Sequence, residues 1–128
     1  MTSHRFTVAA AFVAAIVLFG GRALVAHHSG AMFDDGRVIE LQGTIKEMQW
    51  ANPHIWIQLI VDQNGVKKEW SIEGGSPNTL SRNGWRVTTF KPGDAVTIRV
   101  NPMKDGTTAG MFIGAKFASD GKTIGRWE

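Results

Sequence analysis

Apolar and polar residues alternate along much of the chain after residue 37, in short runs that end at glycine-containing turns. Period-two alternation is typical of strands that bury one face. The runs predict five strands, over residues 38–50, 54–62, 66–73, 95–100 and 111–118. The second run alternates most cleanly, with Ile55, Ile57, Leu59 and Val61 on one side and His54, Trp56, Gln58 and Ile60 on the other.

Turn and capping residues set the order of these elements. Asn64-Gly65 is a strong signal for a tight hairpin between the second and third strands. Ser76 can cap a short helix over residues 77–82, which begins with a proline and ends before an Asn-Gly pair. Three strands, a short helix and two further strands follow the order of an OB-type barrel.

We therefore predict an all-β fold, a small five-stranded OB-like barrel with one short helix between the third and fourth strands. Gly43 in the first strand would permit the sharp coiling that a closed barrel requires. A plain antiparallel sandwich is the alternative topology. The alternation predicts a core that includes Ile57, Leu59, Trp70, Ile72, Val96 and Ile98.

The start of the chain has the features of a cleavable export signal. Arg5 is followed by an uncharged apolar stretch, residues 6–20, and then by a short segment that ends in small residues. The stretch is shorter than the ~20 residues that a transmembrane helix needs, so we expect cleavage and no stable membrane anchor. Cleavage after Ala26 makes His27 the first residue, whereas cleavage after Ala23 leaves three residues ahead of it.

The expected mature protein is periplasmic or secreted. The chain divides into a signal peptide at 1–26, an N-terminal segment at 27–37 and the barrel domain at 38–128. Without the signal, 12 basic residues stand against 11 acidic ones, a net charge of +1 with both signs interspersed. A domain without a basic stripe is not expected to bind nucleic acid. The chain has no cysteine, so its stability must come from a hydrophobic core.

Several short motifs occur together along the mature chain. They include His27-His28-Ser29-Gly30, Trp50-Ala51-Asn52-Pro53-His54, Glu69-Trp70-Ser71-Ile72-Glu73-Gly74 and Lys91-Pro92-Gly93-Asp94. In this combination the chain resembles a domain-of-unknown-function family of small exported bacterial proteins. The resemblance implies an exported β domain and carries no activity. The chain departs from the family's pattern at Leu24, where a smaller residue is usual, and this departure bears on the position of cleavage.

Motifs for the common enzyme chemistries are missing from the sequence. It has no phosphate-binding glycine loop, no G-x-S-x-G nucleophile elbow, no cysteine and no H-E-x-x-H pair. Most aspartates stand at predicted turns, where their side chains typically bond to the nearby backbone. Glu73 differs because it ends a predicted strand before two glycines; we interpret it as part of a solvated face, with a ligand-binding role as the alternative. The sequence therefore favours a binding or structural role over an enzyme.

The histidines of the mature chain lie in two places, His27-His28 and His54. If cleavage exposes His27, its α-amino group and its imidazole can chelate one ion together, which resembles the histidine brace that holds copper in other exported proteins. Imidazole suits copper, zinc and nickel, and copper stands highest in the affinity order. We predict a metal site formed by these three histidines, with copper preferred; a structural His54 and an unliganded tail are the alternative. A thioether nearby would favour cuprous ion, and the candidates are Met32, Met48, Met103 and Met111.

The tryptophans support a different interpretation. OB barrels bind chain-like ligands across the outer face of their second and third strands. Outward aromatic rings on that face would stack against such a ligand. The candidate ligand-binding residues are Trp50, Trp56, Gln58, Glu73 and Trp85. Three functions thus stay open: a metal-binding protein, an OB-type module for a saccharide or peptide, and an assembly subunit of the cell envelope.

Overall fold

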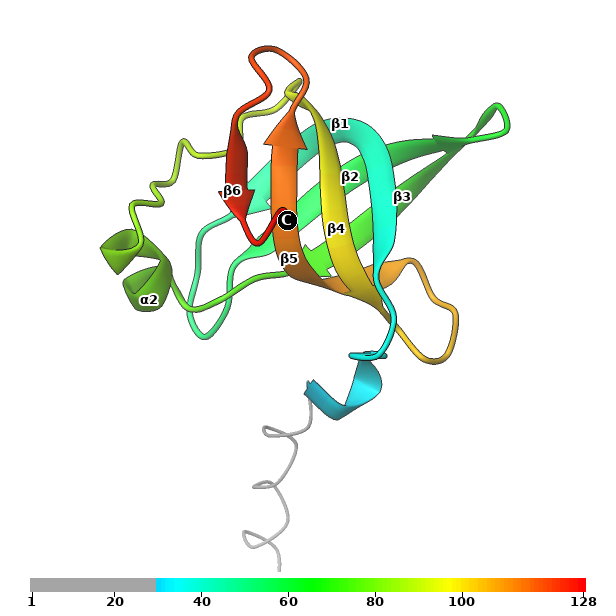
Figure 1. Ribbon diagram of the computed structural model, residues 1–128, viewed down its shortest axis with the longest axis horizontal. Coiled ribbons are helices and arrows are strands. Elements are labelled where there is room, and N and C mark those ends of the chain that lie inside the picture. Colours follow the sequence, from blue (N-terminus) through cyan, green and yellow to red (C-terminus); the bar gives the residue numbers. More distant parts are fainter. Residues whose placement is uncertain (1–29) are drawn as a thin grey trace, which may run out of the picture.

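The computed structural model describes residues 30–128 (Figure 1), so the expected signal peptide and both His27 and His28 lie outside the described residues. Within the described residues, neither helix is long and apolar enough to cross a membrane. The elements are, in order, η1 (Gly30–Met32), β1 (Ile39–Gln49), β2 (Trp56–Gln63), β3 (Val66–Glu73), α2 (Pro77–Arg82), β4 (Ala95–Pro102), β5 (Ala109–Phe117) and β6 (Thr123–Gly125).

Five of the strands close into a barrel. They lie in the order β3-β2-β1-β4-β5 with antiparallel neighbours, and a parallel pairing between β3 and β5 closes the ring. This closure confirms the predicted all-β, OB-like barrel over the open sandwich. The sequence did not predict β6, which adds to β5 as a sixth strand, because its three residues are too few to show an alternating pattern.

The boundaries of β2, β3 and α2 determine where His54 lies in the fold. Strand β3 and helix α2 span the predicted residues, and the Ser76 side chain accepts a hydrogen bond from the Thr79 backbone N–H at the helix start. Strand β2 begins at Trp56, two residues later than predicted. The Ile55 backbone N–H bonds to the Gly75 carbonyl instead of joining the β2–β3 ladder, so His54 lies in the β1–β2 loop.

Strand β1 bends, as its curved ribbon shows, and pairs with two neighbouring strands (Figure 1). Its first half pairs with β4 and its second half with β2, and both pairings include Gly43. A Cβ atom at Gly43 would collide with the carbonyl oxygen of Ile60 on β2. The glycine is therefore required by the close approach of β2, and it permits the coiling that the sequence predicted.

The barrel interior is filled by the residues that the alternation placed there. Every predicted core residue is at most 8% exposed, and Ile57, Leu59, Ile72 and Ile98 are fully buried. The shared core joins residues from all five barrel strands, so it spans the whole domain. The register deduced from sequence is therefore correct for β2, β3 and β4.

The segment before β1 is fastened to the end of the barrel. Phe33 is 4% exposed and forms an isolated bridge with Met103, in the connection between β4 and β5. The Asp34 N–H bonds to the Pro102 carbonyl at 2.8 Å, and the Lys104 N–H bonds to the Met32 carbonyl at 3.0 Å. These contacts hold residues 32–34 against the connection between β4 and β5.

A candidate metal site at the His54–Glu73 pair

His54 and Glu73 form a close pair where strand β3 ends. The Nδ1 atom of His54 lies 2.7 Å from the Oε1 atom of Glu73. The two side chains are unequal in exposure: 40% of the His54 side chain is exposed and 3% of the Glu73 side chain. The imidazole thus lies between a buried carboxylate and the surface of the protein.

The burial of Glu73 corrects the prediction that it belongs to a solvated face. Its backbone pairs with Trp56 on one side and with Met111 on the other, so the residue lies at the seam where β3 and β5 close the barrel. A buried carboxylate is strongly unfavourable unless it is hydrogen-bonded to a partner. Among the described residues, His54 supplies the partner, because its Nδ1 atom lies within ion-pair distance of Glu73 Oε1.

Backbone contacts hold the His54 loop against the chain that follows β3. The Ile55 N–H bonds to the Gly75 carbonyl at 3.0 Å, and the Gly74 N–H bonds to the Ile55 carbonyl at 2.9 Å. A Cβ at Gly74 would lie 2.6 Å from the Ile55 side chain, so only glycine permits this approach. The two glycines after β3 therefore set the position of His54 relative to Glu73.

The pair determines which imidazole nitrogen remains for another ligand. A carboxylate is only an acceptor, so a neutral His54 that pairs with it carries its proton on Nδ1. In a neutral imidazole with a proton on Nδ1, the Nε2 atom carries the lone pair. Metal-binding histidines commonly donate their second ring N–H to a carboxylate in this way, which fixes the ring and increases its basicity.

The pair borders an open hollow of about 560 Å³. Residues from four segments line it: the chain start, the His54 loop, the β3–α2 connection and strand β5. The lining residues are Gly30, His54, Glu73, Gly74, Gly75, Ser76, Thr79, Met111 and Phe112. The hollow therefore brings the start of the described chain next to the one histidine of the barrel domain.

His27 and His28 lie outside the described residues, so the structure does not place them. Within residues 30–128 there is no group of three or more His, Cys, Asp or Glu side chains that could hold a metal ion. A metal site at His54 therefore needs ligands beyond the acidic and histidine side chains of the described residues.

Trp85 does not lie on an outer face, which corrects its placement among ligand-binding candidates. It is 4% exposed and forms edge contacts with Phe90 and Phe112, at centroid distances of 5.6 and 5.2 Å. The residue follows α2, and its ring belongs to the hydrophobic core. No ring face of Trp85 is available to a ligand.

The other aromatic candidates are less deeply buried. Trp50 is half-buried and packs against the core from the β1–β2 loop. Trp56 is also half-buried and stands in register with both Gln49 and Glu73. Cross-strand partners point to the same side of a sheet, so Trp56 shares the outer face with the Glu73 side of the site.

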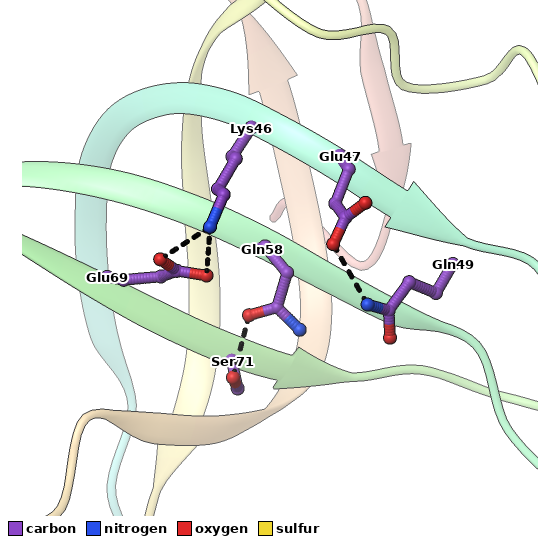
Figure 2. A network of polar contacts seen from close by, with 6 residues as sticks. All are labelled: Lys46, Glu47, Gln49, Gln58, Glu69 and Ser71. Atoms are coloured by element: carbon purple, nitrogen blue, oxygen red, sulfur yellow. Dashed lines mark hydrogen bonds and ion pairs between the residues drawn. The ribbon is translucent and has the colours of Figure 1, made fainter.

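Polar side chains on the outer face of β1, β2 and β3 contact one another, both between strands and, for Glu47 and Gln49, within β1 (Figure 2). The Ser71 hydroxyl donates to the Gln58 side-chain oxygen at 2.7 Å, which leaves Gln58 only 9% exposed. Lys46 donates to both carboxylate oxygens of Glu69, at 2.9 and 3.1 Å, and this contact raises the pKa of Lys46 above its ordinary value. Each of these side chains thus has a polar partner on the same face.

From the sequence, Met111 is only one of four methionines that could supply a thioether. Its place beside Glu73 depends on the parallel pairing of β3 and β5, which joins residues far apart in the chain and leaves no local signal. The fastening of the chain start through Phe33 was likewise missed, because a single aromatic residue in a polar segment gives no periodic pattern.

The fold and this site define the class of protein: a small OB-like β-barrel with a histidine–carboxylate pair beside the strand seam that closes the barrel. A family model described as a family of unknown function (DUF6152) matches residues 15–113, and the chain belongs to this family. No curated protein and no solved structure matches the chain.

Proposed function

We propose that this protein is an exported domain that binds a metal ion, with copper preferred, through His54 together with His27 and His28. The observation that carries the proposal is the pairing of His54 Nδ1 with the buried Glu73, which leaves Nε2 as the ligand atom. The pair borders the hollow that Gly30 also lines, and Gly30 is two residues from His28.

The length of chain supports contact between the two histidine groups. An extended chain covers ~3.3–3.6 Å per residue, so His28 lies within about 7 Å of Gly30 and His27 within about 10 Å, measured between Cα atoms. Phe33 anchors this segment to the barrel and keeps Gly30 at the hollow. Only two or three residues of chain therefore separate the two histidines from a residue that lines the same hollow as His54.

Export with cleavage supplies a further ligand of the proposed site, the α-amino group of His27. Removal of residues 1–26 gives His27 an α-amino group next to its own imidazole, and the two nitrogens chelate one ion. With Nε2 of His54 and the His28 ring, the set is rich in nitrogen and poor in oxygen. Such ligands suit copper, zinc or nickel, whereas calcium and magnesium require oxygen ligands.

Native mass spectrometry of the exported protein tests cleavage and metal content together. The expected species begins at His27 and carries one copper ion, and the same protein with His54→Asn retains much less copper. Asparagine is the matched replacement, because its side-chain N–H₂ can donate to Glu73 while it offers no Nε2 ligand. A membrane-bound species that retains Met1 would disprove export with cleavage, and equal copper content in the two proteins would disprove the role of His54.

A second candidate function is an OB-type module for a saccharide or peptide. The observation in its favour is Trp56, which is half-buried on the outer face of β2 next to the polar pairs of Figure 2. A glycan or peptide array distinguishes the two functions. Binding that is lost with Trp56→Ala and unchanged by His54→Asn would favour this module.

A further inference from the structure

We propose that the outer face of β2 binds an uncharged oligosaccharide, and that Gln58 is the hydrogen-bond donor that determines its specificity. The inference rests on the second candidate function, because it uses the face that carries Trp56. It adds the chemical class of the ligand and the residue that recognises it. It requires no metal ion and no residue outside 30–128.

The register of the strands places an aromatic ring next to an amide on this face. Trp56 is the Cα partner of Gln49 on β1. Gln58 lies between Glu47 on β1 and Ser71 on β3. Residues in register point to the same side of a sheet, and two residues of a strand span roughly 6.6 Å. The ring of Trp56 and the amide of Gln58 are therefore carried side by side by one strand of the barrel.

The Gln58 amide is buried and has its orientation set by a neighbour. The residue is 9% exposed, and the Ser71 hydroxyl donates to its side-chain oxygen at 2.7 Å. In Figure 2 the amide nitrogen points away from Ser71 and makes no contact with the other residues drawn. A buried N–H group that lacks an acceptor costs free energy, so an acceptor on a ligand would be favoured there. Gln58 thus offers two N–H donors in a fixed direction.

The side chains of this face suit a sugar better than a peptide. Residues 56–61 of β2 pair with β1 on one side and with β3 on the other, so their backbone groups cannot add a peptide strand. The face instead offers side chains: Trp56 and Ile60 are half-buried, and Gln58 lies between them on β2. A sugar ring has an apolar face that packs on an aromatic side chain and hydroxyl groups that bond to polar ones.

The charges of the face disfavour an anionic ligand. The residues of Figure 2 include two carboxylates, Glu47 and Glu69, and one ammonium group, Lys46. Lys46 contacts both oxygens of Glu69, and Glu47 accepts a hydrogen bond from the neutral side chain of Gln49. A uronate or a phosphate would therefore meet negative charge with no free cation among these residues to balance it. An uncharged sugar avoids this repulsion, and its hydroxyl groups can donate to Glu47.

Calorimetric titration with oligosaccharides of equal length tests the class of ligand. The uncharged probes are cellotetraose, maltotetraose and chitotetraose, and tetragalacturonate is the anionic probe. The exported protein should bind at least one uncharged probe, and bind it more tightly than the uronate. Absence of binding to all three uncharged probes, or tighter binding of the uronate, would overturn the inference.

Three variants test which residues make the site. Gln58→Met keeps the length of the side chain and removes the amide, and it should weaken binding by about two- to tenfold, the range for a lost hydrogen bond. Trp56→Ala should weaken binding by at least about fivefold, through lost contact with the ring. Gln42→Met is the control, because Gln42 is exposed where β1 pairs with β4 and should not affect binding.

A resonance measurement on the unchanged protein covers the case in which Gln58→Met folds poorly. The side-chain amide resonances of the glutamines are followed while the saccharide that binds in the calorimeter is added. Binding should shift the Gln58 resonance and leave that of Gln42 in place. A bound saccharide that leaves the Gln58 resonance unchanged would contradict the role of this amide.

The outcomes separate this inference from both functions proposed above. Peptide binding that depends on Trp56, without binding of any of the uncharged probes, would make the inference wrong and leave the OB-type module standing. Failure of peptides and saccharides alike would disprove the module together with the inference. Copper binding at His54 is measured separately and depends on neither result.

Discussion

The burial of Glu73 ties the histidine to the fold. A carboxylate with 3% of its side chain exposed needs a polar partner, and the structure places the imidazole of His54 against it. Removal of that partner would leave an unpaired buried charge, a change that typically destabilises a protein by about 3–5 kcal/mol. The same contact that stabilises the fold therefore also presents Nε2.

Replacement of Glu73 by glutamine separates these two roles. Glu73→Gln keeps an acceptor for the Nδ1 proton and removes the negative charge. We expect the protein to stay folded and copper affinity to fall by about 10–100-fold, as for other partners of ligating histidines. Competition titration measures the affinity, and Glu69→Gln is the control, because Glu69 pairs with Lys46 on the outer face. Equal affinities in the two variants would contradict a role for Glu73.

At the scale of the element, the barrel depends on alternation within strands. Leu59 of β2 is fully buried and belongs to the shared core. Leu59→Ala should reduce the free energy of unfolding by about 2–5 kcal/mol, through lost burial and the cavity left behind. Urea denaturation measures the change. A change below about 1 kcal/mol would mean that the site collapses around the smaller side chain or that the register is wrong.

The sequence predicted the strands that have a regular pattern and missed features that depend on distant contacts. The alternation of Ile57, Leu59, Val96 and Ile98 reports burial directly, because each second residue of a strand faces the core. Glu73 and Trp85 were both expected at the surface, and both are buried. Local pattern assigns a charged residue to the surface and leaves an isolated tryptophan undecided, whereas the closure of β3 on β5 and the aromatic cluster with Phe90 determine their burial.

At the scale of the whole molecule, the proposed site brings together the barrel and the segment before β1. The barrel holds His54, and the anchored segment before β1 brings the chain start to the same hollow. Gly30 and His54 line the same hollow because the fold brings their two segments together. The histidines of the proposed site were visible in the sequence, which has four histidines in all.

The affinity for copper should depend on pH. A proton and a metal ion compete for the same nitrogen atoms, so binding releases protons and weakens as the solution becomes acidic. With imidazole ligands we expect most of the loss below about pH 6. Titrations across this range measure it, with the free energy of unfolding followed in parallel to show that the fold persists. Affinity independent of pH between about 5 and 7.5 would argue against imidazole ligands.

The most direct test of the central claim is a copper titration of three proteins side by side. They are the protein that begins at His27, the same protein with one alanine added ahead of His27, and the protein with His54→Asn. We expect one tight copper site in the protein that begins at His27. Binding should be sharply weaker in the protein with the added alanine and in His54→Asn, because each change removes one group of ligand atoms. Equal affinity in all three, or affinity no higher than that of a free peptide of the same N-terminal sequence, would contradict the central claim.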